Sequence, residues 1–414
     1  MATLLLENIS TLVTVATPAG KPPRRSGPEM ADIGVLRDVD VAVEDEVIAW
    51  IGPAGNRAFP GAERIDCRGR TVLPGFVDSH THIVHAGDRA HEFAMRLRGA
   101  TYQEIAASGG GILSTMRAVR ESSVEEIVER SRPLIESAFR HGSTTIEAKS
   151  GYGLDTENEL KLLEAIALLG RESTPTLIPT FLGAHDFPPE YRSDHEPYIK
   201  EIIDRMIPAV AERGLAEFCD VFSDTGYYTI EESERIFNAA RDHGMRLRVH
   251  ADELSGFGGA EMAARIGALS ADHLLMISDP GIEAMRDADV VGTLLPGTAF
   301  FLNLPYAPAR KMIERGMTVA LATDCNPGSN MCESMQMTLA LACMGMRMTV
   351  EEAITAATLN GAAALGIAES VGSIEVGKVA DMAIFTTADY PGIVYHYGVN
   401  QVMGVIKRGI LHRW

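Results

Sequence analysis

The 414-residue sequence is poor in positive charge. Lys and Arg number 37 against 56 Asp and Glu, which gives a formal net charge of −19 at pH 7. This deficit argues against nucleic acid or an anionic membrane as a partner, because both would be repelled. An anionic substrate would need cationic groups gathered locally.

Cysteine and long apolar runs are also scarce. The five cysteines are odd in number and show no CxxC spacing, so we expect a reduced, cytoplasmic protein rather than a disulfide scaffold. The most apolar stretch, residues 290–305, contains Gly292, Pro296 and Gly297 and is too short to span a bilayer. We expect a buried strand and its following loop there. The N-terminal residues lack the basic segment of a signal peptide.

Strand and helix patterns alternate through the middle of the chain. Apolar, strand-like runs end near residues 82, 148, 182, 222, 250, 273, 295 and 324, and helical patterns such as 124–140, 157–169 and 230–243 lie between them. Eight strand–helix units over roughly 300 residues predict an α/β fold, the (β/α)8 TIM barrel. Runs rich in β-branched residues near both ends predict a small discontinuous β-sandwich domain. We expect this domain at 1–73 and 372–414, with the barrel at 74–371.

Histidine and aspartate side chains recur where the predicted strands end. The active site of a (β/α)8 barrel forms at the carboxyl ends of its strands. His80 and His82 close the first apolar run, and the alternation of a strand would put both imidazoles on one face. Six such side chains at five strand ends indicate a site rather than scattered surface chemistry. They are His80, His82, His185, His250, His273 and Asp324.

Four of these side chains suit a metal ion. His80, His82, His250 and Asp324 offer three nitrogens and one oxygen, a set that fits zinc or another borderline ion with room for water. For any one of them alone a hydrogen-bonded core or rim residue is the favoured interpretation, but together they favour the metal. A bound metal would lower the pKa of its water. The ligand set does not distinguish zinc from iron.

Two segments around this pattern resemble the signatures of the amidohydrolase superfamily. They are residues 66–82, which end in His80-Thr81-His82, and residues 372–381. Segments 87–97, 149–154 and 323–329 are similar to the superfamily's imidazolone-propionate hydrolases, and the resemblance covers nearly the whole chain. It implies a metal-dependent hydrolase of histidine degradation. A metal-activated water would open the cyclic amide C–N bond of 4-imidazolone-5-propanoate to give N-formimidoyl-L-glutamate.

The resemblance also implies residue roles. The metal ligands, one zinc or iron ion per subunit, would be His80, His82, His250 and Asp324. The substrate contacts would be Arg89, Tyr152, His185, Glu253, Asn326, Gly328 and Ser329. The catalytic residues would be Asp324, Glu253, His273 and His185.

Arg89 has a clear physical reason for its role. Its planar guanidinium can bind the carboxylate of an anionic substrate in an otherwise acidic chain. The alternative is a surface ion pair with Asp88 or Glu92. Tyr152 follows a glycine-containing turn and could simply pack there, and Tyr102 is a weaker substrate-binding candidate of the same kind.

The expected mechanism divides proton transfers among several groups. Asp324 would take the proton of the attacking water and deliver it to the leaving ring nitrogen, with Glu253 near the ring nitrogens. His273 or His185 would stabilise the tetrahedral oxyanion.

Other interpretations remain open. Many relatives hold two metals bridged by a carboxylated lysine on strand four, but residues 217–224 contain no lysine. One metal is favoured, with a bridging Glu217 or Asp220 as the alternative. A related deaminase or another cyclic amidohydrolase is the leading rival, and a non-catalytic interaction protein is a third. We expect a small anionic substrate, neither nucleic acid nor membrane as partner, and a homodimer.

Overall fold

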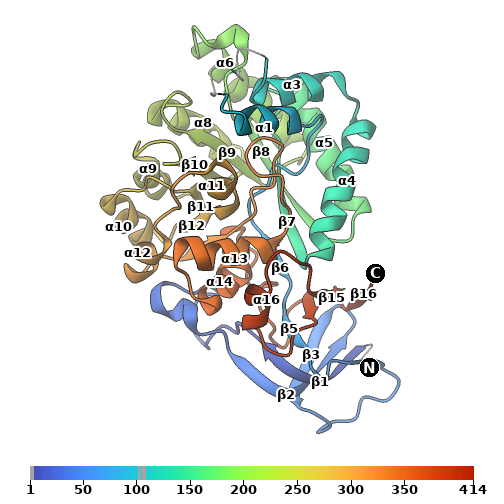
Figure 1. Ribbon diagram of the computed structural model, residues 1–414. Helices are drawn as coiled ribbons and strands as arrows, with labels where there is room; N and C mark the ends of the chain where they lie inside the picture. Colours follow the sequence, from blue (N-terminus) through green and yellow to red (C-terminus); the bar gives the residue numbers. More distant parts are fainter. Residues whose placement is uncertain (1–3, 101–103, 105–108) are drawn as a thin grey trace.

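The computed structural model describes residues 4–100, 104 and 109–414, in which a barrel stands on a smaller sheet. Figure 1 shows that both termini lie at the smaller sheet. The candidate Tyr102 lies outside the described residues. None of the described helices combines the length and the apolar character needed to cross a membrane.

The barrel sheet consists of parallel strands that follow one another in chain order, which confirms the predicted (β/α)8 fold. Almost all of their residues are buried, because helices cover the outer face of the sheet. The strands are β6 (Phe76–Asp78), β7 (Ser143–Lys149), β8 (Thr176–Ala184), β9 (Phe218–Ser223), β10 (Arg246–Ala251), β11 (Ser270–His273), β12 (Val291–Leu294) and β13 (Val319–Leu321).

The helices that connect these strands begin at recognisable sequence signals. Ser123 and Thr229 each accept a hydrogen bond from the backbone N–H three residues on, and Glu126 and Glu232 complete the two capping boxes. The helices up to β10 are α1 (Ala90–Leu97), α3 (Ile112–Glu121), α4 (Val124–Arg140), α5 (Thr156–Glu172), α6 (Glu196–Glu201), α7 (Ile207–Glu212) and α8 (Ile230–Asp242). Those beyond it are α9 (Gly259–Ile266), α10 (Asp279–Asp287), α11 (Pro296–Leu302), α12 (Ala309–Glu314), α13 (Met335–Met346), α14 (Val350–Ala357), α15 (Leu359–Ala364) and α16 (Pro391–Tyr395).

The barrel closes between β6 and β13 through buried hydrogen bonds. The backbone N–H of Asp324 donates to the carbonyl of His80 at 3.0 Å. The Asp78 carboxylate accepts hydrogen bonds from the backbone N–H of Thr323 at 2.9 Å and from its hydroxyl at 2.6 Å. This seam brings segments that lie far apart in the sequence side by side, and each of them carries a predicted ligand.

Strands from both ends of the chain form the second sheet. Their order is β16-β15-β14-β5-β1-β2-β3, with β4 also paired to β1. Apolar residues of β1, β2, β14 and β15 share one core cluster, so the sheet folds around its own core as a β-sandwich does. The strands are β1 (Leu4–Val13), β2 (Val35–Glu44), β3 (Val47–Pro53), β4 (Glu63–Asp66), β5 (Thr71–Pro74), β14 (Met382–Phe385), β15 (Val402–Lys407) and β16 (Ile410–His412). The domain boundaries at 73/74 and 371/372 stay a prediction.

The apolar run 71–82 is not one strand, contrary to expectation. It divides at Gly75 into β5, which joins the terminal sheet, and β6, which joins the barrel. A Cβ at Gly75 would lie 2.3 Å from the Thr144 side chain, so the chain can pass there only as glycine. His80 and His82 therefore follow a strand instead of closing one.

Two further predictions of local structure were wrong. The segment after β12, expected to be a loop, contains α11. The strand β13 ends at Leu321, although the apolar sequence pattern predicted a strand up to Asp324. Asp324 has a left-handed backbone with φ of 53°, which ends the strand geometry before the carboxylate.

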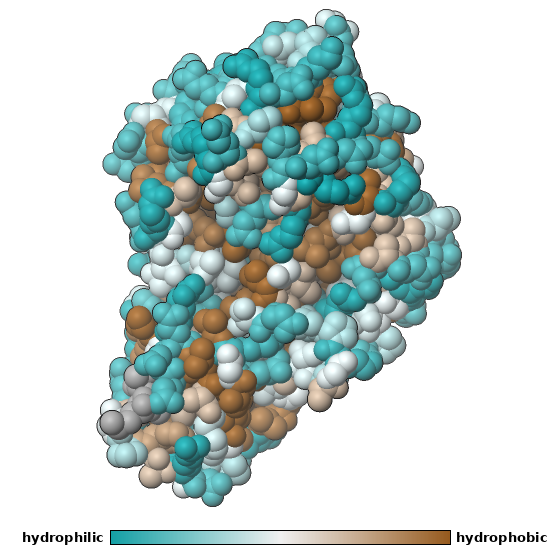
Figure 2. All heavy atoms as spheres, turned by 180° about the vertical axis from the view of Figure 1, so that it is seen from behind, coloured by the Kyte–Doolittle hydropathy of each residue, from teal (hydrophilic) through white to brown (hydrophobic). Residues whose placement is uncertain are grey.

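The two ends of the barrel differ in their surroundings. The terminal sheet lies at one end, and α1, α3 and α6 lie at the other (Figure 1). Seen from behind, hydrophilic residues cover most of the larger lobe, and hydrophobic ones gather toward its middle and the smaller lobe (Figure 2). The carboxyl ends of the barrel strands point away from the terminal sheet.

Candidate active site

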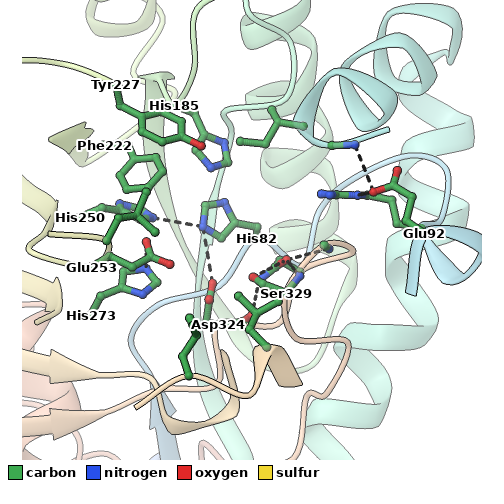
Figure 3. A pocket seen from close by; sticks show the side chains of 18 of the residues that line it. His82, Glu92, His185, Phe222, Tyr227, His250, Glu253, His273, Asp324 and Ser329 are labelled. Carbon is green, nitrogen blue, oxygen red and sulfur yellow. Dashed lines mark hydrogen bonds and ion pairs between the residues drawn. The ribbon is translucent and has the colours of Figure 1, made fainter. Parts of the chain in front are cut away.

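A cavity of about 360 Å³ opens at the carboxyl ends of the barrel strands (Figure 3). It brings together the predicted site residues except His80, which lies fully buried beneath it. The predicted residues that line it are His82, Arg89, Tyr152, His185, His250, Glu253, His273, Asp324, Asn326, Gly328 and Ser329.

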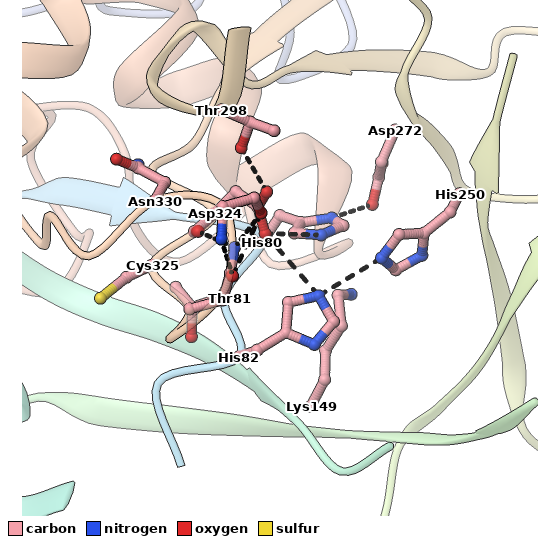
Figure 4. Close-up of polar contacts among 12 residues, drawn as sticks. His80, Thr81, His82, Lys149, His250, Asp272, Thr298, Asp324, Cys325 and Asn330 are labelled. Atoms are coloured by element: carbon pink, nitrogen blue, oxygen red, sulfur yellow. Dashed lines mark hydrogen bonds and ion pairs between the residues drawn. The ribbon is translucent and has the colours of Figure 1, made fainter. Parts of the chain in front are cut away.

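Three imidazoles and one carboxylate converge at the bottom of this cavity (Figure 4). The Nε2 atoms of His82 and His250 are 3.3 Å apart. Asp324 Oδ1 lies 3.6 Å from His80 Nε2 and 3.7 Å from His82 Nε2. Within the described part of the chain, the buried His80 Nε2 has no hydrogen-bond partner. A buried nitrogen without a partner, beside two other imidazoles and a carboxylate, is the donor arrangement of a metal site.

Burial keeps two of these imidazoles, those of His80 and His82, neutral. Burial lowers the pKa of His80 well below its usual range, and the nearby Lys149 charge adds to this. Burial, followed by the influence of His185, lowers the pKa of His82 in the same way. Neutral imidazole is the form that binds a metal.

Buried carboxylates fix the orientation of two of the imidazoles. Asp272 Oδ2 lies 2.7 Å from His80 Nδ1, and Asp220 Oδ1 lies 3.0 Å from His250 Nδ1. When each ring donates a hydrogen bond from Nδ1–H to its carboxylate, the Nε2 lone pair faces the cluster. Sequence reasoning considered Asp220 only as a bridging ligand and missed Asp272, although it directly precedes His273.

A chain of buried charges connects the two sides of the cluster. Lys149 Nζ lies 2.9 Å from Asp220 Oδ2 and 2.7 Å from Glu147 Oε1. Glu147 Oε2 in turn accepts the backbone N–H of Thr81, which stands between the two histidines that follow β6, at 2.9 Å. Burial favours a neutral Asp220, but His250 and Lys149 outweigh it and hold the Asp220 pKa well below its usual range.

Asp324 has an environment suited to exchanging a proton. Burial raises its pKa to about 6, although a hydrogen bond from the Thr298 hydroxyl to Oδ2 opposes that rise. Its other oxygen faces the imidazoles. A carboxyl group with a pKa near neutrality can act both as base and as acid.

His185 presents a hydrogen-bond acceptor. Its Nδ1 lies 2.8 Å from the carbonyl oxygen of Gly151, which can only accept, so Nδ1 carries the proton. Burial lowers the pKa of His185 to about 3, so the ring stays neutral and its Nε2 has no proton to give. This tautomer does not suit the oxyanion role that His185 shared with His273 in the sequence-based mechanism.

Glu253 and His273 form a second pair at the cavity wall. Glu253 Oε2 lies 3.5 Å from His273 Nε2. Burial raises the pKa of Glu253 well above its usual range, and the Asp324 charge adds to this. Burial thus favours the protonated form of Glu253, which can donate a hydrogen bond.

At the outer end of the cavity, Arg89 lies beside an acidic partner. Its Nε donates to Glu92 Oε2 at 2.8 Å, with side-chain exposures of 12% and 8% for the two residues. The ion pair considered as the alternative for Arg89 thus exists, but inside the pocket rather than on the surface. Binding of a substrate and pairing with Glu92 are compatible, because a guanidinium has five N–H donors.

The Asn326 amide organises its own loop. Its Oδ1 accepts the backbone N–H groups of Gly328 at 2.8 Å and Ser329 at 2.7 Å, and its Nδ2 donates to the carbonyl of Asp324 at 2.8 Å. The side chain lines the cavity, yet its main polar atoms are already engaged. The structure therefore gives Asn326 a role in shaping the loop behind Asp324.

Sequence reasoning missed several residues that line the cavity. Arg96 lies within one of the segments that carry the resemblance, and Phe222 closes the fourth predicted strand. Neither was predicted as a site residue, because neither is a histidine or an acid at a strand end. The missed residues are Glu92, Arg96, Ala100, Gly111, Ile112, Phe222, Tyr227, Leu254, Leu302 and Leu304.

Comparison with known proteins gives consistent relatives. The model of the amidohydrolase family matches residues 71–411. The imidazolonepropionase of Geobacillus thermodenitrificans is 48% identical over 415 residues, which cover 99% of this chain and 97% of the relative. That of Alkaliphilus metalliredigens is 45% identical, with 99% and 98% covered.

Solved structures show the same fold at much lower identity. A triazine hydrolase variant is similar with a TM-score of 0.74 and 18% identity, over 99% of this chain and 94% of that one. An adenosine deaminase from Xanthomonas campestris, solved with bound zinc, has a TM-score of 0.73 and 18% identity, with 99% and 92% covered.

Proposed function

The chain belongs to the amidohydrolase family and, within it, with the imidazolonepropionases; from this premise we propose how its cavity performs their reaction. It is a hydrolase that cleaves imidazolone propionate in histidine degradation. One observation carries the assignment of roles. Imidazoles and the Asp324 carboxyl group lie at the bottom of the cavity, and guanidinium groups lie at its outer end. An anionic ring compound fits such a cavity with its ring inward and its carboxylate outward.

The described residues fit a metal ion. We propose that His80, His82, His250 and Asp324 hold it, because the unpartnered His80 Nε2 faces the other donors. When bound, the ion supplies Lewis acidity and lowers the pKa of a water molecule. Zinc and iron both suit this ligand set.

We propose a single ion per subunit. Each oxygen of Asp220 is already engaged, one with His250 and the other with Lys149. Glu217 precedes β9 at its opposite end and pairs with Arg246 at 2.8 Å. Neither of the two candidate bridging residues is thus free to bridge a second ion.

Asp324 is proposed to move the protons of the reaction. Its carboxylate would take a proton from the attacking water and pass it to the leaving ring nitrogen. The Thr298 hydroxyl holds one oxygen of the carboxylate, so the other stays directed at the cavity floor. In the metal-free site burial raises the pKa of Asp324 to about 6, and the charge of a bound ion would lower it.

The cavity wall is proposed to bind the ring and its developing charge. Protonated Glu253 would donate to a ring nitrogen, and His185 Nε2 would accept a ring N–H. Of the two histidines considered for the oxyanion, His273 is the better candidate, because the only ring N–H of His185 already donates to the Gly151 carbonyl. Tyr152 lies at 2% exposure beside both His82 and His185 and closes the ring site.

A spectroscopic assay tests this function. Purified protein is mixed with freshly generated 4-imidazolone-5-propanoate, and loss of the imidazolone absorbance is followed with and without a chelator. We expect turnover that the chelator abolishes and that added zinc or ferrous ion restores. Metal-loaded protein that leaves the substrate intact would contradict the assignment.

We also propose that the protein works as a homodimer in the cytoplasm. The degradation of a free amino acid supports that location, and the high exposure of Tyr395 (88%) and Tyr397 (58%) supports a partner surface. Sedimentation of the intact protein tests the dimer, and a monomer at micromolar concentration would contradict it.

A further inference from the structure

We propose that Arg96 is the specificity-determining residue for the substrate's carboxylate, because it supplies the uncompensated positive charge at the outer end of the cavity. This inference rests on the proposed function, in which that end receives the propanoate group. Arg89 would orient the carboxylate, and Arg96 would provide the net attraction.

The charge balance of the outer end is the first argument. Arg89 pairs with Glu92 at 2.8 Å, and the same carboxylate oxygen accepts the backbone N–H of Gly111 at 3.1 Å. At that distance the Glu92 charge offsets most of the field of Arg89. Among the described residues that line the cavity, Arg89 and Arg96 are the ones with a guanidinium or ammonium group. One positive charge therefore remains, and it belongs to Arg96.

The position of Arg96 is the second argument. It lies one turn after Glu92 on α1, so both side chains reach the same face of the helix. Arg96 Nη2 donates to the carbonyl of Gly328 at 3.1 Å, and its guanidinium lies 5.4 Å from the centre of the Phe301 ring. Within the described residues, its buried Nη1 has no partner. A guanidinium held on two sides, with a donor still unused, is prepared to bind an anion.

The two guanidinium groups meet at Gly328. A Cβ built on that residue would lie 2.2 Å from Arg89 Nη1, so glycine makes room for Arg89 while its carbonyl accepts from Arg96. One carboxylate can therefore contact both cations. Burial and the neighbouring Arg89 lower the pKa of Arg96, a cost that a bound anion would relieve.

The test compares the charged and uncharged forms of one stable probe. Imidazole-4-propanoate and its primary amide are measured as competitive inhibitors of the metal-loaded enzyme. We expect the wild type to prefer the propanoate and Arg96→Met to lose about 10- to 100-fold of that preference, the worth of one charged hydrogen bond. Arg96→Lys should restore part of it, since the charge returns without the fork. Arg98→Met, which removes an exposed arginine just beyond the same helix, is the matched control and should change neither constant.

The outcomes separate this inference from a structural role and from the proposed function. If Arg96 only held the 326–329 loop, Arg96→Met would weaken both probes equally, and that result would overturn the proposal. An unchanged preference would overturn it as well. Failure of the wild type to hydrolyse imidazolone propionate would instead overturn the proposed function.

Discussion

The bottom and the outer end of the cavity are built on different principles. At the bottom, strand carboxylates fix His80 and His250 from below, and Lys149 pairs with one of those carboxylates. At the outer end, Arg89 directly precedes α1 and Arg96 lies on it, in the segment inserted after β6, and both lie against the 326–329 loop. Under the proposed function, the bottom performs the hydrolysis and the inserted segment selects the substrate.

The largest effect is expected from the bottom, at Asp324. Asp324→Asn keeps the size and the hydrogen bond from Thr298 but removes the base. We expect kcat to fall by about 10³-fold, because general acid–base catalysis is worth that much. Steady-state kinetics together with metal analysis measure this. Asp287→Asn, at an exposed carboxylate, serves as control. Near-normal turnover by a metal-loaded Asp324→Asn enzyme would refute the proton-transfer role.

A smaller loss, with a distinct pH signature, is expected at Glu253. Its raised pKa means that the folded protein holds the proton up to a higher pH than a free glutamate would. If the protonated form donates to the substrate, activity is present below that raised pKa and is lost as the pH rises through it. Glu253→Gln should lower kcat by about 10²-fold and remove this alkaline decline. A pH profile of kcat/KM gives the answer, and an alkaline decline that persists in the variant would assign it to another group.

The third effect concerns the supports of the metal site rather than its ligands. Lys149→Met breaks the chain from Thr81 through Glu147 to Asp220 without touching a ligand. Because outer partners orient ligands, we expect metal affinity to fall by about 10- to 100-fold in chelator competition. The carboxylates left unpaired should also lower the free energy of unfolding by about 3–5 kcal/mol.

A second variant separates these two consequences of removing Lys149. Adding Glu147→Gln removes one of the unpaired charges, so the double variant should regain stability but not the metal affinity. Lys311→Met changes an exposed lysine and should alter neither property. If affinity returned together with stability, Lys149 would be a general structural residue rather than a support of the site.

Sequence patterns predicted the bottom of the cavity much better than its outer end. Strand ends are visible as apolar runs, and a barrel brings those ends together, so the sequence alone could place His250 and Asp324 beside His82. The predicted boundary at 73/74 falls beside Gly75, but the break in the strand could not be seen, because it depends on contact with Thr144, a residue of another strand. Asp272 was hidden for a similar reason: its partner His80 is distant in the sequence.

The outer end was harder to predict, because its function depends on the distances between charged side chains. The resemblance of the sequence to the family identified Arg89 as a substrate contact. Its ion pair with Glu92 was considered only as an alternative to that role, and on the surface. Arg96 lies in the same segment, but no sequence pattern marked it as a site residue. Only the structure shows that both arginines meet at Gly328 and that Arg89 is already paired with Glu92.

The smallest expected effect sharpens the contrast between the two ends. Glu92→Gln keeps an oxygen that can accept from Arg89 and from the Gly111 N–H, but it removes the negative charge beside the bound carboxylate. We expect KM for imidazolone propionate to fall about fivefold, the effect of roughly 1 kcal/mol of Coulomb energy. The value of kcat should stay unchanged, because the bottom of the cavity is untouched. Kinetics at two ionic strengths measure this, since screening should shrink the gain. A rise in KM would mean that Glu92 matters by positioning Arg89 rather than by offsetting its charge.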